Sequence, residues 1–140
     1  MRIIVSKSEQ ETYKEADEFL KSLPKDKNLI CLFGDLGSGK TVFVKGLADS
    51  LGIGDYSVKS PTYTFIREYP HQKGTLFHID LYRLDEPDEI LFRQIEELYP
   101  KKGALIVIEW ADKMKDNLPE NRVDICFEYV DKKTRKITIF

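Results

Sequence analysis

The sequence predicts a single α/β domain built on a mixed, largely parallel sheet, and three observations lead to this fold class. Strand-like and helix-like patterns alternate along the chain. A glycine-rich stretch at residues 34–41 joins an apolar strand-like run to a helix-like run. The segment 103–109 is apolar up to its last residue, which is typical of a strand buried on both faces. The 140 residues suffice for one core, so we expect one domain over residues 1–140.

The first half of the chain supplies two predicted strands and two predicted helices. A short strand is expected at residues 2–5, and a helix at residues 8–23, where apolar side chains recur at helical spacing. Pro24 ends this helix. The apolar run 28–33 is predicted to be a buried strand, and residues 41–48 the helix that leaves the glycine-rich stretch.

The middle of the chain predicts two strands followed by a helix. The strands are expected at about 63–69 and 75–81, joined by a polar turn that contains glycine. A helix is expected over residues 86–99, with Asp85 as its N-terminal cap and Pro100 as its stop.

The end of the chain predicts the centre and one edge of the sheet. The strand at 103–109 should lie in the interior of the sheet, because both of its faces are apolar. Two further strand-like runs, 123–130 and 134–140, are separated by a short polar turn and predict a β-hairpin. We see no internal repeat and no long linker.

The composition limits the classes of function. The 22 basic and 24 acidic residues nearly balance, which argues against a strongly basic nucleic-acid-binding domain. No apolar stretch approaches the length of a membrane span, so we expect no membrane partner and a cytoplasmic location. Cys31 and Cys126 lie in apolar runs without metal-ligand spacing, and we interpret both as reduced core residues.

The segment Gly34–Thr41 reads Gly-Asp-Leu-Gly-Ser-Gly-Lys-Thr and fills every fixed position of the phosphate-binding loop pattern. The glycines Gly34, Gly37 and Gly39 allow backbone N–H groups to turn inward around phosphate oxygens. Lys40 would reach the β- and γ-phosphates, and the Thr41 hydroxyl would bind Mg²⁺. The sequence therefore predicts a P-loop NTPase-like sandwich that binds a nucleoside triphosphate.

Two acidic residues are candidates to complete a magnesium site. Asp80 and Glu109 each end a predicted strand, where α/β sheets place their ligands. Strand alternation places His78, Asp80 and Tyr82 on one face. We favour a functional role for Asp80, whereas His78 is as readily a structural residue.

Two further features have equally good structural and functional interpretations. Ser60-Pro61-Thr62 is either a nucleotide-sensing switch segment or an ordinary turn. Trp110 either stacks on a base or a partner surface, or packs against the strand end.

Four segments together resemble the TsaE (YjeE) family of small bacterial ATPases. These are Gly34–Thr41, the stretch Lys-Ser-Pro-Thr-Tyr-Thr at 59–64, the stretch His-Ile-Asp-Leu-Tyr-Arg-Leu at 78–84, and the pair Glu109-Trp110. They occur in the same order as in the family, and the resemblance spans nearly the whole chain.

The resemblance implies a P-loop ATPase that binds ATP and Mg²⁺. It would act with the TsaB and TsaD proteins in forming threonylcarbamoyladenosine at position 37 of tRNA, and would meet tRNA only indirectly through that complex. Thr41, Asp80 and Glu109 would bind the metal, and Lys40, Asp80 and Glu109 would serve catalysis. The implied ATP contacts are Glu9, Gly34, Leu36, Gly37, Ser38, Gly39, Lys40, Thr41, Thr62, Trp110 and Arg135.

Two other functions fit a phosphate-binding loop. A small-molecule or nucleotide kinase would need a second substrate pocket and usually an arginine-rich lid, yet the stretch from Asp80 to Gly103 carries only Arg83 and Arg93. A binding switch would use the nucleotide only to order residues 60–64, with hydrolysis incidental.

Overall fold

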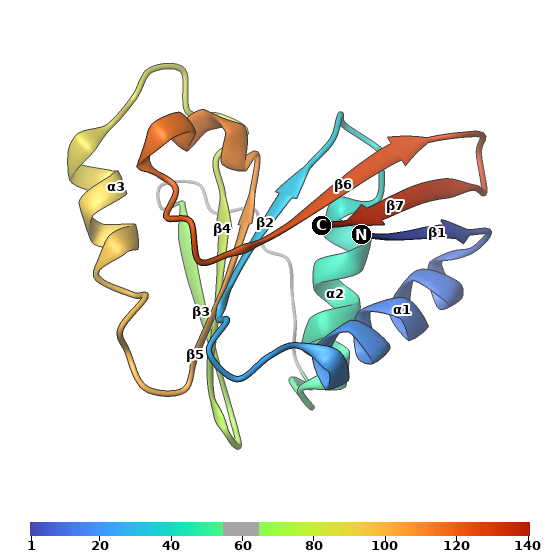
Figure 1. Ribbon diagram of the computed structural model, residues 1–140, viewed down its shortest axis with the longest axis horizontal. Coiled ribbons are helices and arrows are strands. Elements are labelled where there is room, and N and C mark those ends of the chain that lie inside the picture. Colours follow the sequence, from blue (N-terminus) through green and yellow to red (C-terminus); the bar gives the residue numbers. More distant parts are fainter. Residues whose placement is uncertain (55–64) are drawn as a thin grey trace.

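The described strands form one mixed sheet in the order β1-β7-β6-β2-β5-β4-β3. The computed structural model describes residues 1–54 and 65–140, and Figure 1 shows their arrangement. The strands are β1 (Arg2–Ser6), β2 (Leu29–Phe33), β3 (Ile66–His71), β4 (Gly74–Asp80), β5 (Ala104–Glu109), β6 (Val123–Tyr129) and β7 (Arg135–Ile139).

The sheet has a parallel centre and antiparallel edges. Strands β6, β2, β5 and β4 run parallel to one another, whereas the pairs β1–β7, β6–β7 and β3–β4 are antiparallel. This confirms the predicted mixed sheet and the hairpin near the end of the chain. Strand β5 lies between β2 and β4, which confirms its predicted interior position.

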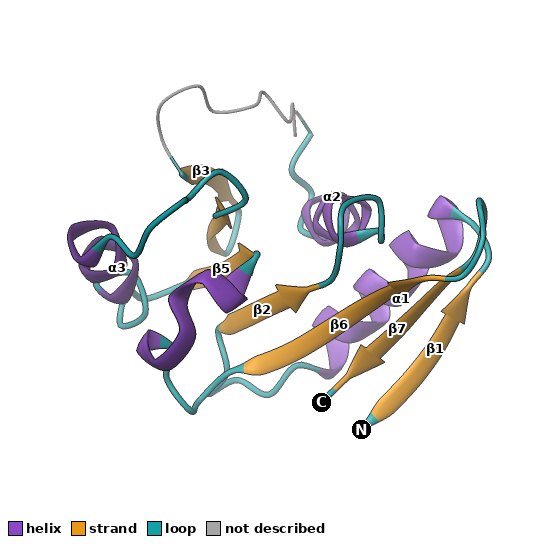
Figure 2. Cartoon of the chain, turned by 90° about the horizontal axis from the view of Figure 1, so that it is seen from above, coloured by secondary structure: helices purple, strands orange, loops and turns teal. Residues whose placement is uncertain are grey.

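Helical segments cover both faces of the sheet. Helices α1 (Glu9–Ser22) and α2 (Lys40–Ser50) lie on one face, and α3 (Glu89–Glu96) and the 3₁₀ segment η1 (Ala111–Asn117) lie on the other (Figure 2). The sequence did not predict η1. None of the helices in residues 1–54 and 65–140 is long and apolar enough to cross a membrane.

Each face of the sheet has its own core. On the α1–α2 face, Phe43 packs edge-to-face against Phe19 of α1 and Phe127 of β6, with ring centroids 5.8 and 5.5 Å apart. On the other face, Phe92 and Ile95 of α3 pack with residues of β4 and β5. Strands β2 and β5 are therefore buried on both faces, as their apolar sequences predicted.

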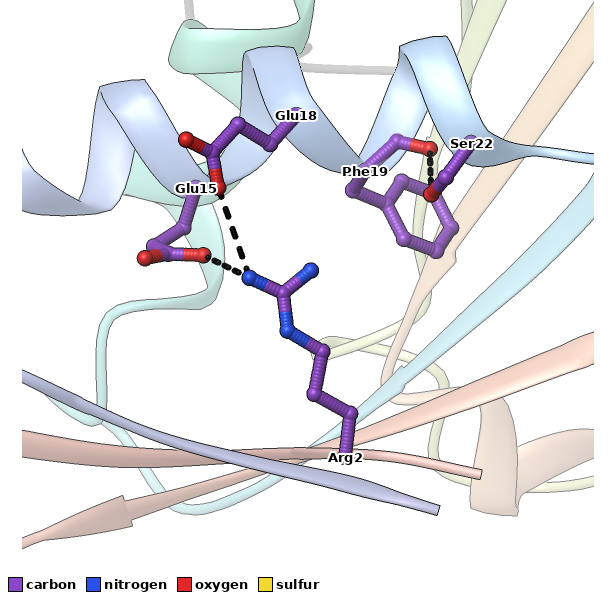
Figure 3. Close-up of polar contacts among 5 residues, drawn as sticks. All are labelled: Arg2, Glu15, Glu18, Phe19 and Ser22. Carbon is purple, nitrogen blue, oxygen red and sulfur yellow. Dashed lines mark hydrogen bonds and ion pairs between the residues drawn. The ribbon is translucent and has the colours of Figure 1, made fainter.

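Helix α1 begins and ends close to the predicted positions. The Ser8 side chain accepts a hydrogen bond from the Glu11 backbone N–H and so caps the first turn. In Figure 3, Arg2 of β1 donates to Glu15 at 2.9 Å and approaches Glu18 at 3.4 Å, which links β1 to α1. The figure also shows the Ser22 hydroxyl donating to the backbone oxygen of Phe19 at 3.0 Å, where the helix ends. Because the Arg2 pairs are partly exposed, they orient the helix more than they stabilise it.

The predicted cap of α3 was wrong. The Asp88 side chain accepts from the Leu91 backbone N–H at 3.0 Å, so the helix begins at Glu89 rather than at residue 86. Asp85 and Asp88 are equally suitable cap types, but the buried helical stripe starts only at Leu91, and the cap lies three residues before it. Pro87 therefore precedes the helix instead of occupying its first turn.

The cysteines are free thiols in the described structure, as the sequence suggested. Cys31 is fully buried in β2, and Cys126 of β6 is partly exposed. Burial raises the pKa of the Cys31 thiol to about 12. Cys31 is therefore a core residue and a poor nucleophile.

Candidate functional site

Three parallel strands bring the predicted site residues to one edge of the sheet. Strand β2 leads into the phosphate-binding loop, β4 ends at Asp80 and β5 ends at Glu109. In the strand registers, Glu109 pairs with both Asp80 and Leu32, so the two acidic residues lie beside the loop. This is the carboxyl end of the parallel strands, where α/β folds bind their ligands.

A cavity of about 720 Å³ opens at this edge and is lined by most of the predicted residues. The predicted residues that line it are Glu9, Leu36, Gly37, Ser38, Gly39, Lys40, Thr41, Asp80, Glu109, Trp110 and Arg135. The cavity is also lined by Lys7 and Ser8 before α1 and by Lys132 and Lys133 in the hairpin turn, none of which was predicted from the sequence. Two adjacent lysines in a predicted hairpin turn could have indicated an anion-binding role. That interpretation needs the structure, because only the fold shows that the turn faces the phosphate-binding loop.

The loop has the backbone shape that a phosphate cradle requires. Gly34, Gly37 and Gly39 have φ angles of 148°, 76° and 104°, values that L side chains rarely adopt. A Cβ on Gly34 would lie 2.6 Å from the Phe127 carbonyl oxygen. Gly34 itself is not in the lining, and its role is to let the hairpin pack close beneath the loop.

Ser38 supplies a buried polar atom within the loop. Its hydroxyl oxygen is shielded and makes no hydrogen bond within the described chain. A buried hydroxyl without a partner is costly, and an anion seated in the loop would give it one. The cradle therefore suits a polyphosphate.

Lys40 lies folded onto the loop. Its ammonium donates to the backbone oxygen of Gly34 and, at 2.9 Å, to that of Asp35. The ammonium also lies 4.3 Å from the centroid of the Trp110 ring, a cation–π distance. Burial lowers the pKa of Lys40, an effect that the nearby carboxylates of Glu109 and Asp80 oppose. The lysine is thus held where it can exchange carbonyl partners for phosphate oxygens.

Glu109 makes one hydrogen bond through each of its carboxylate oxygens. Oε1 accepts from the Thr41 hydroxyl at 3.0 Å, and Oε2 lies 2.5 Å from Nε2 of His78. Both Glu109 and His78 are buried. Because the hydroxyl proton of Thr41 is directed to Glu109, the lone pairs of the hydroxyl remain for a cation.

Asp80 lies opposite Glu109 at the end of β4 and lines the same cavity. Its Oδ1 accepts from the Tyr82 backbone N–H at 3.0 Å. Burial raises the pKa of Asp80, and the neighbouring Glu109 raises it further. Two carboxylates and a hydroxyl form an all-oxygen donor set that fits Mg²⁺.

Trp110 has an unusual backbone for its residue type. Its φ and ψ angles are 58° and 41°, in the left-handed region, at the point where β5 gives way to η1. Its ring lies 5.2 Å from the ring of Tyr82, which is 45% exposed. Such strain in a non-glycine residue is common at functional sites, and here it directs the indole to the cavity beside Lys40.

Arg135 attaches the hairpin to the phosphate-binding loop. Its Nε donates to the backbone oxygen of Gly37 at 3.0 Å, and its Nη1 donates to the backbone oxygens of Asp131 and Thr134. Its guanidinium also stacks on Tyr129 at 4.6 Å. The structure thus gives Arg135 a contact with the loop, and a contact with the nucleotide stays a prediction.

The outcome is different for Thr62 and His78. Thr62, with Ser60 and Pro61, lies outside the described residues. His78 shares a strand face with Asp80, as predicted. It is not in the cavity lining, and its hydrogen bond with Glu109 connects it to a residue that is.

Comparisons with known proteins identify the family. The profile described as "Threonylcarbamoyl adenosine biosynthesis protein TsaE" matches residues 6–137. The tRNA threonylcarbamoyladenosine biosynthesis protein TsaE of Aquifex aeolicus is 38% identical over 143 residues, covering 100% of this chain and 96% of the relative. The Bacillus subtilis protein of the same name is 36% identical, covering 91% of this chain and 78% of the relative.

A solved structure agrees with the sequence comparison. The crystal structure of YdiB from Bacillus subtilis matches with a TM-score of 0.75 and 28% identity, covering 99% of this chain and 83% of that chain. The fold match and the profile match span nearly the same residues. The chain therefore belongs to the TsaE family, as its four sequence segments suggested.

Proposed function

We propose that this protein is a Mg²⁺-dependent ATPase that supports the formation of threonylcarbamoyladenosine in tRNA, acting with the TsaB and TsaD proteins. One observation carries the ATPase part: the Thr41 hydroxyl, at the start of the helix that follows the loop, is hydrogen-bonded to the buried Glu109. This joins the phosphate-binding loop to the acidic end of a neighbouring strand, which is the arrangement that nucleotide hydrolysis requires.

The phosphates would occupy the loop, with the backbone N–H groups of residues 37–41 and the N-terminus of α2 facing them. Lys40 would release the carbonyl oxygens of Gly34 and Asp35 and donate to the β- and γ-phosphates. The Ser38 hydroxyl would gain the partner that it lacks.

Thr41, Asp80 and Glu109 would hold the magnesium ion. The Thr41 hydroxyl would offer a lone pair while it continues to donate to Glu109. Mg²⁺ bound there would neutralise charge on the β- and γ-phosphates. The carboxylates of Asp80 and Glu109 would accept hydrogen bonds from metal-bound water or contact the metal directly.

Hydrolysis by the isolated protein should be slow. Among the described residues that line the cavity, the only guanidinium is that of Arg135, which already donates to the loop and hairpin backbone. An arginine supplied by a partner accelerates such reactions by about 10³ to 10⁵. This supports an ATPase that is coupled to a partner complex.

The tRNA role rests on the relatives. Those from Aquifex aeolicus and Bacillus subtilis carry names that place them in tRNA threonylcarbamoyladenosine biosynthesis. Participation of TsaB and TsaD is what the family resemblance implies. A cytoplasmic location stays a prediction.

Reconstituted tRNA modification tests the proposal. With TsaB and TsaD at low concentration relative to tRNA, this protein with MgATP should permit many rounds of modification. Lys40→Ala should permit about as many as an assay without the protein. Modification that proceeds equally with no added protein would contradict the role.

The purified protein alone tests the alternative that it is a kinase. Phosphate release is measured with and without small phosphoryl acceptors. Transfer of the phosphoryl group to an acceptor instead of water would overturn the ATPase assignment.

A further inference from the structure

His78 is buried next to the proposed magnesium site without lining it. It lies in β4, two residues before Asp80, and its side chain is only 8% exposed. Its Nε2 lies 2.5 Å from Oε2 of Glu109, whose side chain is 3% exposed. With Glu109 ionised, its carboxylate can only accept, so the donor in this hydrogen bond is the Nε2–H of His78.

This hydrogen bond fixes the orientation of the Glu109 carboxylate. One oxygen is held by His78, so the other is directed to the Thr41 hydroxyl at 3.0 Å. The result is a chain of hydrogen bonds from His78 through Glu109 to Thr41. It links strands β4 and β5 to the first turn of α2.

Without the His78 donor, the carboxylate could rotate and would keep a buried oxygen with no partner. The Thr41 hydroxyl could then turn its proton toward the cavity, where a cation needs a lone pair. The arrangement is similar to metal sites in which a second hydrogen-bonding layer orients the ligands, and loss of such a partner typically weakens metal binding by about 10- to 100-fold.

We propose that His78 is a positioning residue for the magnesium site, which holds Glu109 so that the lone pairs of Thr41 face the cation. This inference rests on the proposed function, because it concerns the metal that accompanies ATP. It assigns His78 no contact with ATP.

The test compares two substitutions of His78. His78→Leu removes the donor and replaces the imidazole with an apolar side chain of similar size. His78→Gln keeps an N–H donor that can reach Glu109. His71→Gln is the matched control, because His71 is the only other histidine in the sequence and does not line the cavity.

Mn²⁺ serves as the probe, and its affinity for the protein–ATP complex is measured by electron paramagnetic resonance. His78→Leu should weaken Mn²⁺ binding by about tenfold or more, while His78→Gln and His71→Gln should bind as the unaltered protein does. ATP affinity in excess EDTA, measured by calorimetry, should be the same for all four proteins.

The experiment distinguishes a failure of the proposed function from a failure of the inference about His78. If the unaltered protein with ATP does not bind Mn²⁺, the proposed function fails and the inference fails with it. If it binds Mn²⁺ but His78→Leu binds equally well, only the inference is overturned. Equal losses in His78→Leu and His78→Gln, or a parallel loss of ATP affinity in EDTA, would show that His78 acts only through packing.

Discussion

Replacing Gly34 with alanine should destabilise the protein more than the same change at Gly37. At Gly34 (φ 148°) a Cβ would lie 2.6 Å from the Phe127 carbonyl oxygen and 2.7 Å from the Ser38 hydroxyl oxygen. At Gly37 (φ 76°) a Cβ would meet nothing within 4 Å. Both variants place a side chain at a positive φ angle, and only Gly34→Ala adds steric clashes, with the hairpin and with Ser38.

The expected magnitudes follow from these contacts. A side chain in a sparsely populated backbone region costs about 1–3 kcal/mol. Forcing well-packed backbone aside costs about another 1–3 kcal/mol. Gly34→Ala should therefore lose about 2–6 kcal/mol of unfolding free energy, and Gly37→Ala about 1–2 kcal/mol. The entropy that alanine removes from the unfolded chain is similar in both variants, so it cancels in the comparison.

Urea unfolding followed by circular dichroism at 25 °C measures both free energies. Comparable slopes of the transitions would show that the unfolded states are alike. If Gly34→Ala loses no more stability than Gly37→Ala, then the hairpin does not press on the loop as described, and the reasoning is refuted.

The other predictions concern catalysis, a spectroscopic signal and pH. Asp80→Ala and Glu109→Ala should lower MgATP turnover by about tenfold or more while affecting metal-free ATP binding little, and unchanged turnover in both would contradict the metal assignment. Trp110 fluorescence should change on saturation with MgATP because Lys40 leaves its ring; a silent spectrum would indicate a packing role alone. The Asp17 pKa is lowered chiefly by its hydrogen bond with Lys21, so Asp17 contributes stability above its ordinary pKa, and this contribution is lost as the pH falls. Asp17→Asn should therefore unfold more easily than the unaltered protein at pH 7, with the difference starting to shrink near pH 4 and continuing to shrink at lower pH in urea titrations.

Local patterns were enough to predict most of the fold. The strand that enters the phosphate loop, the interior position of β5 and the final hairpin follow from apolar runs and turn residues of adjacent sequence. The start of α3 was missed because Asp85 and Asp88 are equivalent as caps until packing selects one. The 3₁₀ segment after Trp110 lacks any strong periodic signal, since it depends on a left-handed residue that is not glycine.

The sequence predicted most of the residues that the structure gathers around one cavity, but not the hydrogen bonds that join them. The loop pattern and the strand ends identified Lys40, Thr41, Asp80 and Glu109. The link from His78 to Thr41 depends on the register between β4 and β5 and on side-chain orientation. The approach of the hairpin to the loop depends on strand order, which joins residues about a hundred positions apart. Neither is visible in a local pattern.

The pairing of β1 with β7 has a consequence for how the protein is made. Within the described sheet, β1 comes first in the sequence and has only one neighbour, β7, which comes last among these strands, with Arg2 opposite Ile139. Because synthesis is slow compared with local folding, β1 stays unpaired until β7 has been synthesised. The hairpin that packs against the phosphate-binding loop is completed when the same strand, β7, is synthesised. A nascent chain should therefore acquire nucleotide affinity in one step rather than gradually.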